Sequence, residues 1–303
     1  MYFCAKKLMK VLPKETPTKD LHQYLLGSIA PRPIAFVSTI DKDGKINLAP
    51  FSFFNVFSAK PPIVVFSPAY SGKTGLSKNT LDNVKEHPEC VINVVNYSMV
   101  HKMNLASSPY PKGINEFEKA GFTPIPSEFV KPPRVLESPV QLECKVQQII
   151  ELGKEGGAGN LVIAEVLLLH INDNILNDEK MIDPRKIDLV SRMNGNWYCR
   201  ANGDALFELP KLDSDIVVGI DAIPEYAKQS GIFSESDLIK LASEKSLPSD
   251  EDVKKLKNDI QNELSTLPTE KLYLNLCLHA KECLQKNELS KAWQYLLIPK
   301  TLN

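Results

Sequence analysis

Polar side chains that suit an anion gather at two places in the first third of the chain. Ser38 and Thr39 place hydroxyl groups at the end of a predicted strand, and Lys78, Thr80 and Asn83 lie at the start of a predicted helix. The first backbone N–H groups of a helix have no partner within it, so a cation and a hydroxyl there favour a bound anion. These residue types therefore suggest an anion site.

Sequence motifs for other nucleotide sites are incomplete. Residues 71–74 read Ser-Gly-Lys-Thr, the end of a P-loop, but Pro68 and Ala69 precede them and the upstream glycine is missing. The glycines of residues 156–159 fall in a predicted hairpin loop, whereas a dinucleotide fingerprint needs a strand-to-helix turn. Neither motif predicts a nucleotide site.

Catalytic and metal-binding motifs are also missing. The sequence has no G-x-S-x-G and no H-E-x-x-H, and none of its six cysteines forms a C-x-x-C pair. His279 and Cys283 are four residues apart on a predicted helix, but two ligands are too few for zinc and their neighbours are apolar. We expect no metal site and six reduced, structural cysteines.

The residues of the first part read as a β-rich domain, a barrel or a sandwich. Residues 21–70 read as strands and turns, with Ile34–Ile40 and Ile46–Phe57 flanking a turn at Asp41–Gly44, which predicts a hairpin with Gly44 at positive φ. A short helix is expected over Thr80–Glu86, with Thr80 as a candidate cap. Further elements are expected at Ile63–Ser67, Cys90–Val95, Pro139–Leu152 and Leu161–Ile171 (strands) and near Asn115–Ala120 (a short helix).

The last hundred residues have a different composition. Residues 204–303 carry 12 basic and 17 acidic residues, whereas residues 1–203 carry 24 and 20 and hold all five arginines. Two composition regimes predict two domains, 1–203 and 204–303, the second a helical region of unknown role. Its helices are expected at Pro224–Gln229, Glu235–Lys245, Asp250–Leu264, Thr269–Lys286 and Leu289–Leu297.

Composition excludes several classes of protein and partner. The chain has 303 residues, 43% hydrophobic and 24% charged, which excludes a disordered or low-complexity protein. A net charge of -1 is unlike the basic surface that binds nucleic acid. No apolar run approaches the ~20 residues that span a bilayer, and Lys6 and Lys7 interrupt any signal sequence, so we expect a cytoplasmic protein without a membrane partner.

Several segments, in collinear order, resemble the flavin-reductase-like, FMN-binding split-barrel family, which includes flavoredoxin-like proteins. The first reads Arg-Pro-Ile-Ala-Phe-Val-Ser-Thr and the second Ala-Pro-Phe-Ser-Phe-Phe. The resemblance covers residues 20–200 approximately and leaves the helical tail unexplained. The matching segments are Arg32–Thr39, Ala49–Phe54, Pro61–Ser67, Asn104–Gly121, Pro132–Cys144 and Arg192–Arg200.

The resemblance implies an α+β fold: a six-stranded antiparallel Greek-key split β-barrel, here followed by a small all-α region. It also implies a homodimer that holds FMN in a groove near the dimer interface. Lys78, Thr80 and Asn83 would bind the phosphate, Ser38 and Thr39 the phosphate or the ribityl chain. The implied cofactor-binding residues are Arg32, Ser38, Thr39, Ala49, Pro50, Phe51, Ser52, Phe53, Phe54, Asn55, Ser67, Lys78, Thr80 and Asn83.

Some of these assignments have a structural alternative. The backbone of Ala49–Asn55 would bond the pyrimidine edge of the ring and its phenylalanines would form an apolar wall, but the same phenylalanines could be barrel packing. Arg32 could be a phosphate partner or a surface arginine. The family's Lys-Asp-Thr phosphate motif is Lys-Asn-Thr here, because Asn79 replaces the aspartate.

The resemblance implies an oxidoreductase, with the cofactor supplying the redox chemistry. NAD(P)H would pass a hydride to N5 of bound FMN, and electrons would then reach free flavin or an acceptor protein. No side chain reads as an obligatory acid or base, so catalytic residues stay unassigned. Two alternatives stay open: a flavoredoxin-like electron carrier without direct nicotinamide activity, and a non-enzymatic binding module.

Overall fold

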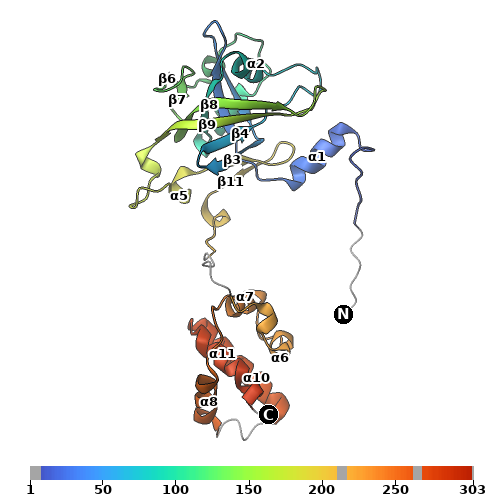
Figure 1. The fold of residues 1–303 in the computed structure, drawn as a ribbon, viewed down its shortest axis with the longest axis vertical. Helices are drawn as coiled ribbons and strands as arrows, with labels where there is room; N and C mark the ends of the chain where they lie inside the picture. Colours follow the sequence, from blue (N-terminus) through green and yellow to red (C-terminus); the bar gives the residue numbers. More distant parts are fainter. Residues whose placement is uncertain (1–7, 210–216, 262–267, 302–303) are drawn as a thin grey trace. The chain divides into compact units, whose positions relative to one another are not determined.

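The computed structural model describes residues 8–209, 217–261 and 268–301. The chain divides into two compact units, Met1–Phe207 and Glu208–Asn303 (Figure 1). No helix among the described residues combines the length and the apolar character that crossing a membrane requires.

The first unit is built on one antiparallel sheet of seven strands in the order β2-β1-β5-β8-β9-β4-β3. The expectation of six strands is wrong in this detail, and edge strands β2 and β3 do not pair with each other. Figure 1 shows the long β8–β9 hairpin within the sheet. The strands are β1 (Ala35–Ile40), β2 (Ile46–Phe51), β3 (Phe54–Ala59), β4 (Pro62–Phe66), β5 (Glu89–Val94), β8 (Val140–Glu151) and β9 (Asn160–Ile171).

The extra strand arises from a bend at Ser52 and Phe53. The predicted extended segment Ile46–Phe57 is divided there, so that β2 pairs with β1 at one edge of the sheet and β3 pairs with β4 at the other. The backbone N–H of Ser67 donates to the carbonyl of Phe53 at 2.8 Å and holds the bend against the end of β4. The bend thus joins the two sheet edges.

The β1–β2 hairpin is confirmed. Gly44 has φ +79°, and its N–H donates to the carbonyl of Asp41 at 3.0 Å. Side chains on β1 alternate between two apolar clusters: Ala35 and Val37 face the barrel interior, and Phe36 faces a second cluster formed with the helices after β5. Because both faces of β1 are covered, its sequence is continuously apolar.

Helices surround this sheet. The prediction of strands and turns from residue 21 is wrong at its start, because α1 (Thr18–Ser28) is a helix; none of its residues is buried, which explains its weak apolar pattern. The predicted helix after residue 79 is confirmed as α2 (Asn79–Glu86). The remaining elements are α3 (Val100–Ala106), α4 (Glu116–Ala120), α5 (Pro184–Ile187) and the short pairs β6 (Pro124–Ile125) with β7 (Arg134–Val135) and β10 (Val190–Arg192) with β11 (Tyr198–Arg200).

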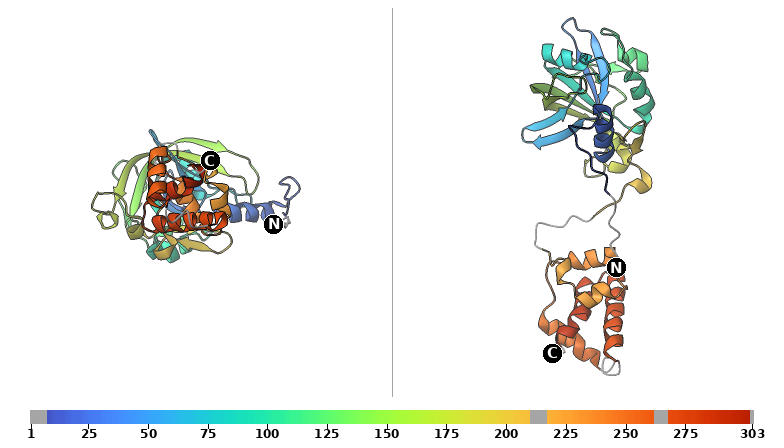
Figure 2. Two further views of the ribbon diagram at one scale, coloured as in Figure 1. Left: turned by 90° about the horizontal axis from the view of Figure 1, so that it is seen from below. Right: turned by 90° about the vertical axis from the view of Figure 1, so that its right-hand side faces the viewer.

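The second unit is helical, as predicted (Figure 2). Trp293 is fully buried at its centre, and its indole N–H donates to the carbonyl of Leu241 at 3.0 Å. His279 stacks on Tyr295 with ring centroids 5.1 Å apart, and Cys283 is buried, so these two residues pack as expected. The helices are α6 (Glu225–Gln229), α7 (Glu235–Ala242), α8 (Asp250–Asp259), α10 (Thr269–Gln285) and α11 (Leu289–Leu297); the end of the predicted Asp250–Leu264 helix lies outside the described residues.

Candidate functional site

Two adjoining cavities lie where β2, the Ser52–Phe53 bend and α2 meet. One has a volume of about 520 Å³ and extends from β2 to residues 106–112; the other, of about 480 Å³, extends along the bend to α1. Together we call them the groove. Both are lined by the same five residues, which makes the groove continuous: Pro50, Phe51, Ser71, Lys73 and Lys78.

The start of α2 gives the groove a positive end. Lys78 is the N-cap residue of α2 and is exposed, and Lys73 and Lys112 line the same cavity. Three ammonium groups beside a helix N-terminus favour an anion. The only carboxyl group among the described lining residues is Glu116, whose Oε2 accepts the N–H of Leu48 at 2.9 Å. Burial raises the pKa of Glu116, although this hydrogen bond opposes the shift.

A buried polar network holds α2 against the β1–β2 hairpin. The Asn47 amide donates to the Thr80 hydroxyl at 2.9 Å and to the Thr39 hydroxyl at 3.4 Å. The Asn83 amide donates to the same Thr39 oxygen at 3.0 Å. Thr39, Thr80 and Asn83 are at most 2% exposed, so the network positions the groove wall and only Thr80 of these three lines the large cavities. Thr80 makes no side-chain cap of α2, contrary to expectation.

The apolar wall comes from the end of β2 and the bend. Phe51 is buried and packs against Phe66 with ring centroids 5.7 Å apart, whereas Phe53 is 40% exposed. Ala49 and Pro50 line the cavity without bulky side chains, and the hydroxyl of Ser67 accepts the N–H of Asn160 at 3.1 Å at the far side of the bend. An extended backbone beside an apolar slot suits a planar heteroaromatic ring.

The groove therefore contains part of the predicted set. Five predicted residues line its first cavity: Ala49, Pro50, Phe51, Lys78 and Thr80. The second cavity adds three more, Ser52, Phe53 and Ser67.

Other predicted residues lie outside the groove. The hydroxyl of Ser38 donates to the carbonyl of Pro133, Phe54 packs against the barrel interior, and Asn55 is exposed on edge strand β3. Arg32 is 6% exposed and donates to three backbone carbonyls, of Leu26, Ile29 and Met193. Its guanidinium joins chain segments, so the structure gives it a positioning role here.

Sequence reasoning missed several groove residues. His22 on α1 lies beside Phe53, with ring centroids 6.4 Å apart, and lines the second cavity. One wall of the first cavity is formed by residues 107–112 and Glu116, which lie after β5 and so far along the chain from β2. No spacing signal links these segments to residues 47–53; only the packing of α3 and α4 onto β2 brings them there.

A seven-stranded antiparallel sheet, with a groove beside its β2 edge that has cations at one end and an apolar wall at the other, is the arrangement of a split-barrel protein. Residues 26–186 match the sequence model of the flavin reductase like domain. The chain belongs to this family, and the recognition from sequence is confirmed.

Individual relatives agree with this assignment. A protein of Aquifex aeolicus is 38% identical over 196 residues, which is 65% of this chain and 97% of that protein. Nitrilotriacetate monooxygenase component B from Bacillus cereus is similar in structure, with a TM-score of 0.63 and 32% identity over 68% of this chain and 100% of the other. The 2-nitrobenzoate 2-nitroreductase NbaA of Pseudomonas fluorescens has a TM-score of 0.59 and 27% identity, covering 67% and 96%.

Proposed function

We propose that this protein binds FMN in the groove and acts as an NAD(P)H-dependent flavin reductase or oxidoreductase. The observation that carries the proposal is the continuity of the groove: it joins a cavity lined by three lysines (Lys73, Lys78 and Lys112) to an apolar wall at Phe51 and Phe53. Family membership supports a flavin, and a component of a monooxygenase and a nitroreductase among the structural relatives support redox chemistry.

The groove residues fit FMN by their chemistry. Lys73, Lys78 and the start of α2 would hold the phosphate, with Thr80 fixed beside them by Asn47. The backbone of β2 would face the polar edge of the ring, since the sheet pairs β2 on one side alone and, of the outer groups, the Leu48 N–H is held by Glu116. When bound, the flavin would supply hydride acceptance at N5; the chain would bind the cofactor, orient it and exclude water.

Partners and location belong to the same proposal. Edge strand β3 exposes Val56 and Phe57, 66% and 68% accessible, and such an apolar edge supports pairing with a second copy in a homodimer. The electron acceptor would be free flavin or a protein, and the protein would act in the cytoplasm.

An absorption spectrum of the purified full-length protein tests this function. FMN is added, unbound flavin is removed, and NADH or NADPH is then added without oxygen. Retained flavin bands that bleach with either nucleotide are the expected result. Retained bands that bleach only with dithionite would replace the reductase by an electron carrier, and failure to retain FMN would leave a non-enzymatic binding module.

A further inference from the structure

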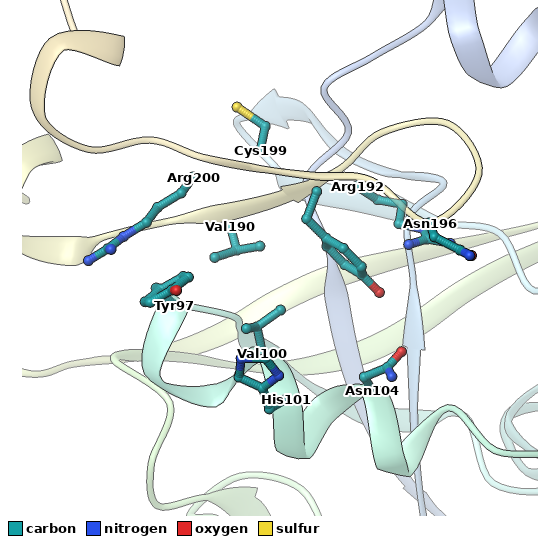
Figure 3. A pocket seen from close by; sticks show the side chains of 10 residues that line it. Tyr97, Val100, His101, Asn104, Val190, Arg192, Asn196, Cys199 and Arg200 are labelled. Carbon is teal, nitrogen blue, oxygen red and sulfur yellow. The ribbon is translucent and has the colours of Figure 1, made fainter.

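A third cavity of the first unit lies outside the groove. It has a volume of about 540 Å³ and opens between α3 and the β10–β11 hairpin. In Figure 3, His101 and Asn104 of α3 lie on one side, and Arg192 and Asn196 lie on the other, while Cys199 points away from α3. The volume is in the range of small-molecule sites and exceeds that of an inorganic ion.

The cavity carries one uncompensated guanidinium. Arg200 is neutralised by Asp188, with Nε–Oδ1 at 2.7 Å and Nη2–Oδ2 at 2.8 Å. Arg192 has no carboxylate within 4 Å in the part of the chain that the structure describes, and it stacks on Tyr198 with its guanidinium carbon 4.5 Å from the ring centroid. Burial is the main cause of the lowered pKa of Arg32, and the charge of Arg192 lowers it further. The local field is therefore positive.

The remaining lining groups suit an anion that carries a ring. His101 and Asn104 are exposed and lie one turn apart on α3, and Asn196 faces them with a second amide. Tyr97 is 44% exposed and adds aromatic surface on the ring face that Arg200 does not cover, since the Arg200 guanidinium carbon lies 3.8 Å from the ring centroid. A guanidinium fork binds phosphate in two-point geometry, whereas the amides and aromatic faces suit a nucleobase and its ribose.

We propose that the cavity between α3 and β10–β11 binds an adenosine phosphate, with Arg192 on the phosphate. One source of this ligand is the adenosine end of the nicotinamide dinucleotide, an assignment that rests on the proposed function; the other is a free adenine nucleotide.

Helix α3 contributes to both sites, because Asn104 lines this cavity and Ala106 lines the groove. Residues two positions apart lie about 3 Å apart along the helix axis but on nearly opposite sides of the helix. The cavity is therefore separate from the groove, and competition between ADP and the nicotinamide dinucleotide decides which source supplies the ligand.

Calorimetric titration of the full-length protein with ADP and with adenosine tests the cavity. ADP is expected to bind and adenosine to bind at least tenfold more weakly, because only ADP engages Arg192. Arg192→Ala should weaken ADP binding at least tenfold, and His101→Ala should weaken it by a smaller factor. Arg185→Ala is the matched control, since Arg185 lies on α5 outside the cavity lining.

Fluorescence gives a second readout. Trp197 is 77% exposed beside Asn196, whereas Trp293 is buried in the other unit. ADP should change the Trp197 emission in the wild type and the Arg185→Ala variant. No ADP binding up to about 10 mM, which is weaker than about 3 kcal/mol, or equal ADP affinity in the Arg192→Ala and Arg185→Ala variants, would overturn the proposal.

Competition separates the two sources. If ADP raises the KM for NADH or NADPH in the wild type, the cavity serves the electron donor; if ADP binds without competing, it serves a free nucleotide. Flavin that bleaches with NAD(P)H in a protein without ADP binding overturns this inference alone. ADP binding in a protein whose flavin never bleaches leaves the cavity assignment intact and overturns the reductase.

Discussion

The hydroxyl of Thr39 accepts a hydrogen bond of 3.0 Å from the amide of Asn83, joining β1 to α2 across 44 residues of sequence. Thr39 is fully buried, and its register partner Asn47 donates to the same oxygen. These contacts let the hairpin position the start of α2, where the proposed phosphate site lies.

Replacing this hydroxyl should destabilise the first unit. Thr39→Val keeps the shape but leaves buried amide donors without an acceptor, which costs about 1–3 kcal/mol. Thr39→Ser keeps the hydroxyl and loses one methyl group, about 0.8 kcal/mol. Urea unfolding followed by circular dichroism measures both, and a valine variant as stable as the serine variant would disprove the role of the hydroxyl.

Removing two side chains of the proposed phosphate site should weaken FMN binding. In Lys78→Ala combined with Thr80→Ala, each lost charge-assisted contact is expected to weaken binding by about 1.5–3 kcal/mol, roughly tenfold or more. Fluorescence titration with FMN measures this change. Lys85→Ala is the control on the same helix, because Lys85 pairs with Glu151 at 2.6 Å. Unchanged titration curves for the double variant would place the phosphate elsewhere.

Glu116 should oppose an anion in the groove once it is ionised. Burial raises its pKa, so the neutral form persists to higher pH than in an exposed glutamate. Glu116→Gln removes the charge, and its amide oxygen can still accept the Leu48 N–H. We expect FMN to bind about three- to tenfold more tightly to this variant at neutral pH, as a like charge several ångströms away implies.

The pH dependence of FMN affinity should follow from the same repulsion by ionised Glu116. In the wild type, FMN affinity should fall as pH rises through the raised pKa of Glu116, and this component should be missing in Glu116→Gln. Riboflavin lacks the phosphate and is the control, since its binding should respond little to either change. Equal pH profiles of the two proteins with FMN would contradict the role of Glu116.

The contacts of Asp237 should make the stability of the helical unit sensitive to acid. Partial burial disfavours its charge, but hydrogen bonds from Lys281 and Ser234 outweigh this and lower the pKa of Asp237 from 3.8 to about 2. Because the folded pKa is below the unfolded value, its stabilisation is present above about pH 4 and is lost as pH falls toward 2. The shift corresponds to about 2 kcal/mol.

This contribution can be isolated with Trp293, which is buried in the same unit. In a Trp197→Phe background, urea unfolding monitored by Trp293 should show Asp237→Asn less stable by about 2 kcal/mol at pH 7 and less sensitive to acid. Glu225→Gln removes an exposed pair with Lys228 and should change stability by less than about 1 kcal/mol. Identical acid limbs for wild type and Asp237→Asn would refute the assignment.

The parts of the fold and of the site that the sequence predicts are those that depend on local patterns. The β1–β2 hairpin and α2 follow from a turn glycine and from short-range periodicity, and Lys78 and Thr80 follow from their place at a helix start. The bend at Ser52–Phe53 could not be predicted, because it results from pairing with two different strands.

Long-range contacts account for the rest of the site. His22 reaches the groove from a helix with no buried residue, and Glu116 reaches it through a hydrogen bond to Leu48, 68 residues earlier. Arg32, a candidate phosphate ligand by sequence, is instead buried among carbonyls. Such outcomes depend on strand register and packing, which single-sequence patterns do not contain.

The contacts of Arg32 also tie residues beyond the family match into the first unit. The family match spans residues 26–186, yet Arg32 binds the carbonyl of Met193, and the backbones of Arg32 and Arg192 exchange two hydrogen bonds of 3.0 and 2.8 Å. A fragment cut at residue 186 would keep the Leu26 and Ile29 acceptors of Arg32 but would lose Met193, at a cost of about 1.5–3 kcal/mol for the lost charged hydrogen bond. The contacts that hold Arg32 in place therefore extend to Met193, beyond the limits of the recognisable family sequence.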